Sequence, residues 1–102
     1  MSQWQQLFKI NTLQPGHGVQ ASIGGKVLAV FNVKGKFYAI DDTCTHAGAS
    51  LAEGSVAGTV VTCPWHGATF DIATGAVLSD PAYEGVQSYS VKVEGDSVFV
   101  EI

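Results

Sequence analysis

Residues 26–40 have the sequence KVLAVFNVKGKFYAI, in which two apolar segments flank the dipeptide Lys34-Gly35. Apolar residues occupy both sets of alternating positions in the first segment, so a strand formed here is apolar on most of both faces. The second segment, Lys36 to Ile40, is rich in aromatic and β-branched residues. Because a short glycine-containing pair between such segments favours a tight turn, the stretch predicts a β-hairpin.

The same two-residue period recurs in most of the chain outside this hairpin. Near the C-terminus Val91 and Val93 alternate with charged residues, and Gly95-Asp96 predicts a turn into a last apolar alternation. Further strand and turn signals lie at residues 4–10, residues 59–62, Phe70 with Ile72, and Thr74-Gly75. No stretch has sustained helical periodicity. The sequence therefore predicts one all-β domain over residues 1–102, either a sandwich of sheets or a small barrel.

The composition is that of a globular domain with an acidic surface. Apolar residues make up 46% of the chain and charged residues 14%, which argues against disorder. The net charge is −4 with five dispersed lysines and no arginine, so we expect no nucleic acid partner, because phosphate contacts need clustered basic side chains. No apolar run of about 18 residues occurs, and residues 1–10 lack the pattern of a signal peptide. We therefore expect a cytoplasmic protein without a membrane anchor.

Four potential metal ligands lie within 23 residues of one another. Cys44-Thr45-His46 and Cys63-Pro64-Trp65-His66 each offer one thiolate and one imidazole. The sixteen residues 47–62 between them are enough for an excursion and a returning strand that brings the two loops face to face. Two thiolates and two imidazoles suit either a single tetrahedral zinc ion or a [2Fe-2S] cluster.

The spacing of these residues favours the cluster. Structural zinc sites generally pair like ligands close together, whereas this chain mixes Cys and His within each half. The pattern C-x-H, sixteen residues, C-x2-H resembles that of the Rieske iron-sulfur proteins, and the resemblance covers nearly all of the chain. The matching residues are Cys44-Thr45-His46 with Gly48 and Leu51, Cys63-Pro64-Trp65-His66-Gly67, Phe70-Asp71, Thr74-Gly75, Pro81-Ala82, Tyr89, Val91, Val93 and Gly95-Asp96.

This resemblance implies a fold, a cofactor and a ligand set. Rieske proteins are built from stacked antiparallel β-sheets, with the cluster at the tip of two loops and a third loop over it, which here would be Pro81-Ala82. By the resemblance, Cys44 and Cys63 would hold one iron of a single Rieske-type [2Fe-2S] cluster, and His46 and His66 would hold the other.

Departures from known subfamilies narrow the expected role. Rieske proteins of cytochrome bc complexes have a membrane anchor and an extra cysteine in each loop, at the positions that Ala49 and Trp65 occupy here. They also have a serine and a tyrosine that donate hydrogen bonds to the cluster and a ligand, at the positions of Ala68 and Phe70. Without these donors the reduced cluster is stabilised less, so we expect a potential near the low end of the roughly −150 to +300 mV span of Rieske centres.

The histidine count separates the chain from the terminal Rieske oxygenases. Their catalytic iron needs two further histidines, whereas His17, in a turn signal where we expect it to be solvated, is the one left here. The chain instead resembles the small soluble Rieske ferredoxins of multicomponent bacterial oxygenase systems, which are electron carriers and not enzymes. The resemblance implies transfer of single electrons from an NAD(P)H-dependent flavoprotein ferredoxin reductase to a terminal oxygenase, such as an aromatic-ring dioxygenase of aromatic hydrocarbon catabolism.

Two alternatives remain open. The chain could be a small Rieske-type subunit or electron donor of another reductase, such as nitrite reductase. In a different class, it could be a structural zinc-binding β module.

The expected partners dock transiently over the loops of His46 and His66, and the chain itself is expected to be a monomer, because electron-transfer interfaces are typically small. Trp65, beside His66, either contacts a partner or shields the cluster. The acids Asp41 and Asp42, ahead of the first loop, are expected to be exposed and either steer a basic partner or only add solubility.

Overall fold

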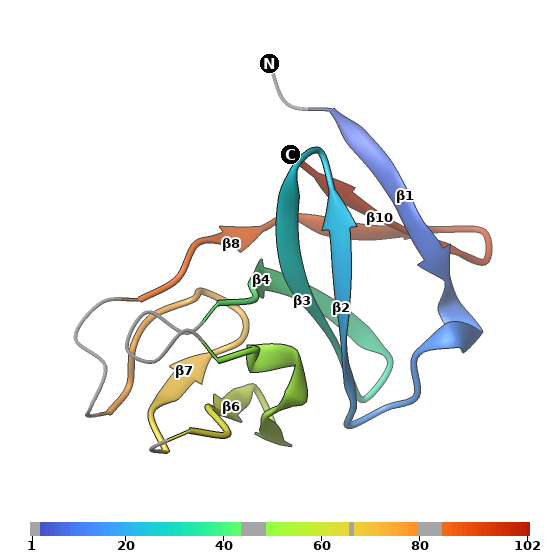
Figure 1. Ribbon diagram of the computed structural model, residues 1–102. Helices are drawn as coiled ribbons and strands as arrows, with labels where there is room; N and C mark the ends of the chain where they lie inside the picture. The colour runs from blue at the N-terminus through green and yellow to red at the C-terminus, as the bar shows by residue number, and fades with distance from the viewer. Residues whose placement is uncertain (1–2, 44–48, 66, 80–84) are drawn as a thin grey trace.

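The computed structural model describes residues 3–43, 49–65, 67–79 and 85–102. The described elements are, in chain order, β1 (Trp4–Lys9), the 3-10 helix η1 (Ile10–Thr12), β2 (Gly18–Ile23), β3 (Lys26–Val33), β4 (Lys36–Asp41), the 3-10 helix η2 (Leu51–Glu53), β5 (Ser55–Ala57), β6 (Val60–Thr62), β7 (Thr69–Asp71), β8 (Ser88–Tyr89), β9 (Val91–Glu94) and β10 (Ser97–Glu101). The strands form three antiparallel sheets (Figure 1), with the orders β1-β10-β9, β2-β3-β4-β8 and β5-β6-β7. The predicted all-β architecture of stacked antiparallel sheets is confirmed. Across these ranges there is no helix with the length and apolar character needed to cross a membrane.

The sheet β2-β3-β4-β8 lies between two hydrophobic cores. Ala29 and Phe31 of β3 pack into one core, and Leu28 and Val30 pack into the other. All four side chains are 0% exposed, because alternate residues of a strand point to opposite faces and both faces of β3 are covered. This arrangement explains the two-sided apolar pattern of residues 26–33. The buried residues of the loop-side core are Ala29, Phe31, Ile40, Ala49, Leu51, Val61, Cys63, Ala68, Phe70 and Ile72, and those of the terminal core are Leu13, Leu28, Val30, Phe37, Ala39, Val98 and Val100.

The predicted hairpin forms between β3 and β4. Lys34 has φ 53° and Gly35 has φ 89°, and positive values at both central positions give the turn the twist that a two-residue hairpin loop requires. The register pairs Leu28 with Asp41, so β4 ends one residue before Asp42 and the first predicted ligand loop. The turn chemistry at one end of the hairpin therefore sets where that loop begins at the other.

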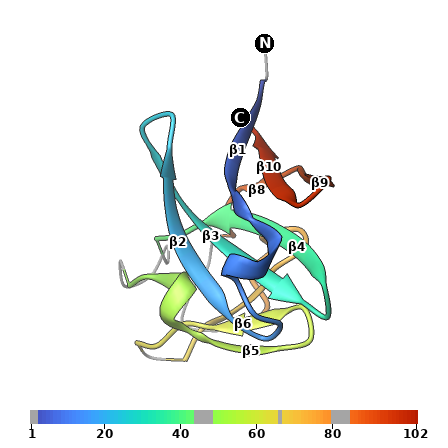
Figure 2. The same cartoon turned by 90° about the vertical axis from the view of Figure 1, so that its right-hand side faces the viewer.

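The sheet β1-β10-β9 brings the two ends of the chain together (Figures 1 and 2). Gln3 and Ile102 exchange backbone hydrogen bonds of 2.9 and 3.1 Å. In the same sheet Val98 and Val100 are fully buried in the terminal core, whereas Val93 is 45% exposed. The predicted half-buried terminal hairpin is therefore present.

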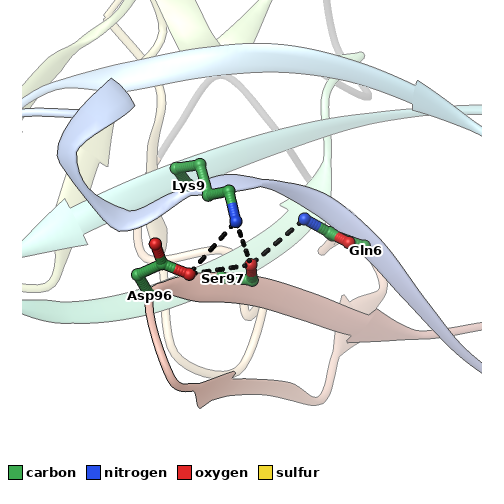
Figure 3. A network of polar contacts seen from close by, with 4 residues as sticks. All are labelled: Gln6, Lys9, Asp96 and Ser97. Atoms are coloured by element: carbon green, nitrogen blue, oxygen red, sulfur yellow. Dashed lines mark hydrogen bonds and ion pairs between the residues drawn. The ribbon is translucent and has the colours of Figure 1, made fainter.

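A polar network ties β1 to the turn between β9 and β10 (Figure 3). The side-chain amide of Gln6 donates to Ser97 Oγ at 3.1 Å, and Lys9 Nζ donates to Asp96 Oδ1 at 3.1 Å. The hydrogen bond from Lys9, and then its charge, lower the pKa of the exposed Asp96 carboxyl. The contact of Lys9 with Asp96 is exposed and that of Gln6 with Ser97 is partly buried, and both add to the pairing between β1 and β10.

The sheet β5-β6-β7 lies at the end of the molecule away from the termini (Figure 1). Each of its strands has three residues, and its register pairs Val61 with Phe70 and Thr62 with Thr69. The second predicted ligand loop, residues 63–68, therefore connects two paired strands.

Some element boundaries differ from the sequence-based expectations. The strand expected at residues 4–10 ends at Lys9, and the one expected at residues 59–62 begins at Val60. Three strands were not expected from the sequence, namely β2, β5 and β8. β2 forms because all six of its residues pair with β3, and β5 and β8 are too short to show a periodicity of their own.

Candidate metal centre

The structure describes Cys63 among the four predicted ligands. Cys44, His46 and His66 lie outside the described residues, as does Pro81-Ala82 of the predicted covering loop. The residues that flank these positions are described, and they define the bases of three loops.

The second predicted ligand loop is the connection of a hairpin. The backbone N–H of Cys63 donates to the carbonyl of Ala68 at 2.7 Å, one step beyond the last pair of the β6-β7 ladder. Gly67 has φ 77°, a conformation that favours glycine. Cys63 is 2% exposed at the base of the loop, whereas Trp65 is 56% exposed. This exposure favours the interpretation of Trp65 as a contact residue over that of a shield.

The side chain of Cys63 belongs to the loop-side core. Ala68 and Phe70 are 0% exposed in the same core. By the resemblance, they occupy the positions where the Rieske proteins of cytochrome bc complexes have hydroxyl donors. Neither side chain can donate a conventional hydrogen bond to sulfur. The surroundings of Cys63 are thus apolar at both of these positions.

The first predicted ligand loop is held at its base by a network around Asp42. Thr43 and Ser50 form an isolated antiparallel bridge that closes the loop. Asp42 Oδ1 accepts hydrogen bonds from Ser50 Oγ at 2.8 Å and from the backbone N–H of Ala52 at 3.0 Å. Asp42 Oδ2 accepts a hydrogen bond from Gln20 Nε2 at 2.6 Å.

Both flanks of the third loop are attached to β7 and the turn that follows it. Ser79 Oγ lies 2.7 Å from Thr69 Oγ1 and accepts a hydrogen bond from the backbone N–H of Thr69 at 3.2 Å. On the other flank, the backbone N–H of Val86 donates to the carbonyl of Gly75 at 2.7 Å. The second and third loops are therefore fixed to one hairpin.

Asp41 contacts the strand that follows the third loop. Its Oδ1 accepts a hydrogen bond from the hydroxyl of Tyr89 at 2.6 Å, and its Oδ2 accepts one from the backbone N–H of Gln87 at 3.2 Å. Partial burial raises the pKa of Tyr89 to about 12, and the hydrogen bond to Asp41 and the negative charge of that carboxylate act in the same direction. Asp41 and Asp42 thus hold different segments although they are neighbours in the chain.

The expectation that Asp42 is exposed is wrong, since it is 3% exposed and all of its carboxylate hydrogen bonds are internal. The sequence carries no local signal for this role, because Gln20 and Ser50 lie 22 and 8 residues away in the chain. His17 lies in the expected turn and is exposed.

The chemistry of the donor set fits a Rieske-type [2Fe-2S] cluster. Cys44 and Cys63 offer soft thiolates, and His46 and His66 offer imidazoles, which are the two ligand types of such a centre. The burial of Cys63 in an apolar core suits a thiolate that must be kept from water. Within the ranges that the structure describes, no group of three or more His, Cys, Asp or Glu side chains forms another metal site.

Comparison with protein families identifies the family of this chain. The chain belongs to the Rieske [2Fe-2S] domain family, whose model matches residues 3–90. Its cofactor is therefore a Rieske-type [2Fe-2S] cluster, as the mixed Cys and His loops predicted, and the alternative of a structural zinc module is not supported.

Two curated relatives match the chain almost from end to end. Ferredoxin CarAc of Metapseudomonas resinovorans is 38% identical over 98 residues, which are 95% of this chain and 92% of that protein. The ferredoxin component of the naphthalene 1,2-dioxygenase system of Pseudomonas aeruginosa is 32% identical over 99 residues, 97% of this chain and 95% of that protein. Because these relatives are ferredoxins, the prediction of an electron carrier rather than an enzyme is confirmed.

Solved structures of ferredoxins and related proteins have the same fold as this chain. A chain in the complex of reduced oxygenase and oxidized ferredoxin of carbazole 1,9a-dioxygenase has a TM-score of 0.88 and 38% identity, and the match covers 95% of this chain and 91% of that chain. A putative NADH-dependent nitrite reductase small subunit from Mycobacterium tuberculosis has a TM-score of 0.90 at 24% identity, over 100% of this chain and 96% of that chain. At that identity the second likeness concerns the fold alone.

Proposed function

We propose that this chain carries single electrons from an NAD(P)H-dependent flavoprotein reductase to the terminal oxygenase of a ring-hydroxylating dioxygenase system. The observation that carries the proposal is the nearly complete mutual coverage with the ferredoxin component of a naphthalene 1,2-dioxygenase system and with a chain of the carbazole 1,9a-dioxygenase complex, 95 to 97% of this chain and 91 to 95% of those chains. The match is therefore not confined to the cluster-binding loops. The solved complex of an oxygenase with its ferredoxin supports the terminal oxygenase as one of the two partners.

The proposed ligands are Cys44 and Cys63 on one iron and His46 and His66 on the other. When bound, the cluster supplies a reversible one-electron couple. The loop-side core keeps water from the sulfur of Cys63, and the hairpin bond from Cys63 to Ala68 fixes the start of the second ligand loop. Residues 1–102 form the single domain that holds the cluster.

The proposed docking surface is formed by the loops of His46 and His66. Trp65 lies within the second of these loops, and Leu78, whose backbone N–H donates to the carbonyl of Thr69 on β7, follows that strand in the chain; their side chains are 56% and 51% exposed. Large exposed apolar side chains provide contact area without ordering long flexible chains. We expect both partners to bind this surface transiently, with the chain a monomer in the cytoplasm and a lower affinity at high salt if its charge of −4 contributes to docking.

The alternative role, as a subunit or electron donor of a nitrite reductase, has weaker support. The corresponding solved structure resembles this chain at 24% identity, which carries a statement on the fold alone. The ferredoxin component of the naphthalene system resembles it at 32% identity, and the chain of the carbazole 1,9a-dioxygenase complex resembles it at 38%. The dioxygenase role is therefore the one we propose.

The test begins with the metal content of the anaerobically purified full chain. We expect iron and acid-labile sulfide in equal amounts, about two of each per chain, and partial bleaching on addition of one electron. The presence of zinc without sulfide would end the Rieske assignment for this chain.

The proposed electron-transfer partners are tested in a reconstituted assay. The chain is combined with NADH, a flavoprotein ferredoxin reductase and the terminal oxygenases of the naphthalene and carbazole systems, and the hydroxylated product is measured with and without the chain. We expect product with at least one oxygenase. If no oxygenase is supported, while the chain restores nitrite reduction to a nitrite reductase that lacks its small subunit, the alternative role is correct.

A further inference from the structure

Asp42 is unusual among the charged residues of this protein. It is 3% exposed, and in the described ranges it is the one charged side chain that is buried. Neither of the two ion pairs seen there, Lys9 with Asp96 and Lys92 with Glu94, includes it. Burying a carboxylate without a cationic partner is costly unless hydrogen bonds satisfy it. The hydrogen bonds of Asp42 must therefore offset the cost of its burial, and the segments that they connect indicate its role.

The carboxylate of Asp42 joins the two ends of the first ligand loop. Asp42 directly precedes the loop, and two of its three donors directly follow it, namely the hydroxyl of Ser50 at 2.8 Å and the backbone N–H of Ala52 at 3.0 Å. The third donor, Gln20 Nε2 at 2.6 Å, belongs to β2. The loop is thus tied both across its own base and to the neighbouring sheet.

The backbone of Asp42 makes the same two connections. Its carbonyl accepts a hydrogen bond from the N–H of Leu51 at 2.7 Å, and its own N–H donates to the carbonyl of Val27 on β3 at 3.2 Å. Between the described flanks of this loop, strand pairing consists of the single bridge between Thr43 and Ser50. The hydrogen bonds of Asp42 therefore add to the few backbone contacts that hold these described flanks together.

The neighbouring acid shows that this role is particular to Asp42. Asp41 directs its carboxylate to the hydroxyl of Tyr89 and the N–H of Gln87, which follow the third loop. In the described part of the chain, Asp42 is thus the carboxylate that binds the flanks of the first ligand loop. A charged acceptor is suited to this task because charge-assisted hydrogen bonds are stronger than neutral ones.

We propose that Asp42 is a positioning residue that fixes the first ligand loop, so that Cys44 and His46 are presented to the cluster in one geometry. This inference rests on the proposed function, because it assumes that these two residues are ligands. A residue that orients metal ligands without touching the metal governs how readily the metal is lost and how uniform the site is. Those two properties provide the test.

The experiment compares Asp42→Ala, Asp42→Asn and Ser50→Ala with the wild-type holoprotein. The rate at which an iron chelator bleaches the cluster is measured anaerobically, together with the EPR spectrum of the reduced state. We expect Asp42→Ala to bleach at least about tenfold faster and to have a broadened spectrum, because loss of a ligand-orienting group typically weakens a metal site by that factor or more. Ser50→Ala removes one of the three donors and is expected to have a smaller effect.

The hydrogen bonds of Asp42 lead to two further expectations. Asp42→Asn is expected to lie between wild type and Asp42→Ala, because the amide oxygen still accepts from Ser50 and Ala52 while the amide nitrogen faces Gln20. In the Asp42→Ala background, Ser50→Ala is expected to change the bleaching rate little, since its acceptor is already gone.

The matched control is Ser97→Ala, at the opposite end of the molecule. Ser97 is 7% exposed, and its hydroxyl accepts partly buried hydrogen bonds from Gln6 and Lys9, so its replacement by alanine also deletes polar contacts. We expect this variant to unfold at a lower urea concentration, with an unchanged EPR spectrum and a bleaching rate within about twofold of wild type, because the hydrogen bonds that it loses lie at the end with the termini. If Asp42→Ala and Ser97→Ala bleach equally fast at equal stability, Asp42 is not a positioning residue. If Asp42→Ala does not fold, Ser50→Ala and Gln20→Ala take its place, and wild-type rates and spectra in both would overturn the inference.

Failure of the proposed function has a different signature. A wild-type chain without iron and sulfide would overturn the ligand assignment, and this inference with it. A wild-type chain with an intact cluster, combined with Asp42 variants that behave like Ser97→Ala, would overturn this inference alone.

Discussion

The two ends of the molecule are built differently. At the end with the termini, β1 and β10 have six and five residues and pair along most of their length, although the register shifts once between Gln6 and Phe8. At the other end, β5, β6 and β7 have three residues each, and much of the chain is loop. There the side chains of Asp42, Ser79 and Asp71 accept hydrogen bonds from backbone N–H groups, those of Ala52, Thr69 and Ala73 respectively. Longer strand pairing thus holds the end with the termini, with side-chain hydrogen bonds added to it, whereas the flanks of the predicted ligand loops are held mainly by particular side chains.

Substitution of a predicted ligand is expected to have the largest effect on cluster incorporation. We expect His66→Ala to abolish stable cluster incorporation, because an iron that loses one of its two imidazoles is no longer held by the protein. The visible spectrum and the iron content of the purified variant measure this. His17→Ala is the control, because His17 is exposed in the turn before β2, and it is expected to leave the spectrum unchanged. An unchanged spectrum in His66→Ala would refute the ligand assignment.

A glycine at the loop-bearing end is expected to tolerate substitution less well than a comparable glycine elsewhere. Gly75 has φ 81°, and a Cβ atom there would collide with the carbonyl of Val86, the residue that anchors the third loop. Gly25, in the turn between β2 and β3, has φ 80° and open space around the same position. Gly25→Ala is expected to cost about 1–2 kcal/mol from backbone strain alone, and Gly75→Ala about 1–3 kcal/mol more from the collision.

Urea unfolding of the two glycine variants, followed by circular dichroism, measures the difference. Equal destabilisation would mean that the segment after the third loop moves aside freely. That result would contradict the view that this segment is fixed to the turn after β7.

The apolar surroundings of Cys63 are expected to set the reduction potential. We expect the wild-type potential to lie in the lower half of the roughly −150 to +300 mV span of Rieske centres, and Ala68→Ser to raise it by adding a hydroxyl donor in the loop-side core. Ala57→Ser adds a hydroxyl at an exposed position of β5, in the sheet β5-β6-β7. We expect it to leave the reduction potential unchanged. Redox titration followed in the visible range measures all three proteins. A wild-type potential in the upper half of that span would show that hydrogen-bond donors outside positions 68 and 70 act on the cluster.

The smallest expected effect concerns alkaline pH. Since the pKa of Tyr89 is raised from its ordinary 10.0 to about 12 by partial burial and by Asp41, the fold favours the neutral phenol. This contribution to stability is fully present below pH 10 and is lost as the pH rises from about 10 to about 12. Tyr89→Phe is therefore expected to flatten the decline of stability over that interval, as measured by urea unfolding at successive pH values. Asp41→Asn, which removes the neighbouring charge, is expected to flatten it partly. An equally steep decline in Tyr89→Phe would assign the alkaline sensitivity to another group.

Much of the fold was predictable from local patterns. The two-sided apolar run at residues 26–33, the Lys34-Gly35 turn and the terminal hairpin all appear where the sequence indicated them, because strand periodicity and turn chemistry are properties of neighbouring residues. β2 escaped prediction because its half-buried pattern depends on pairing with β3. The strands β5 and β8, of three and two residues, are too short to carry a pattern.

For the metal centre, the sequence by itself determined the chemistry. Two mixed Cys and His loops indicated an iron-sulfur cluster, and the family match agrees, because ligand type and spacing are written directly in the chain. The tertiary structure decided what surrounds those loops. It buried Asp42, which the sequence had placed on the surface, and connected it to Gln20 and Ser50, and it turned the adjacent Asp41 toward Tyr89. Such contacts depend on which distant segments meet, and a carboxylate is buried or exposed according to the donors that the fold brings to it.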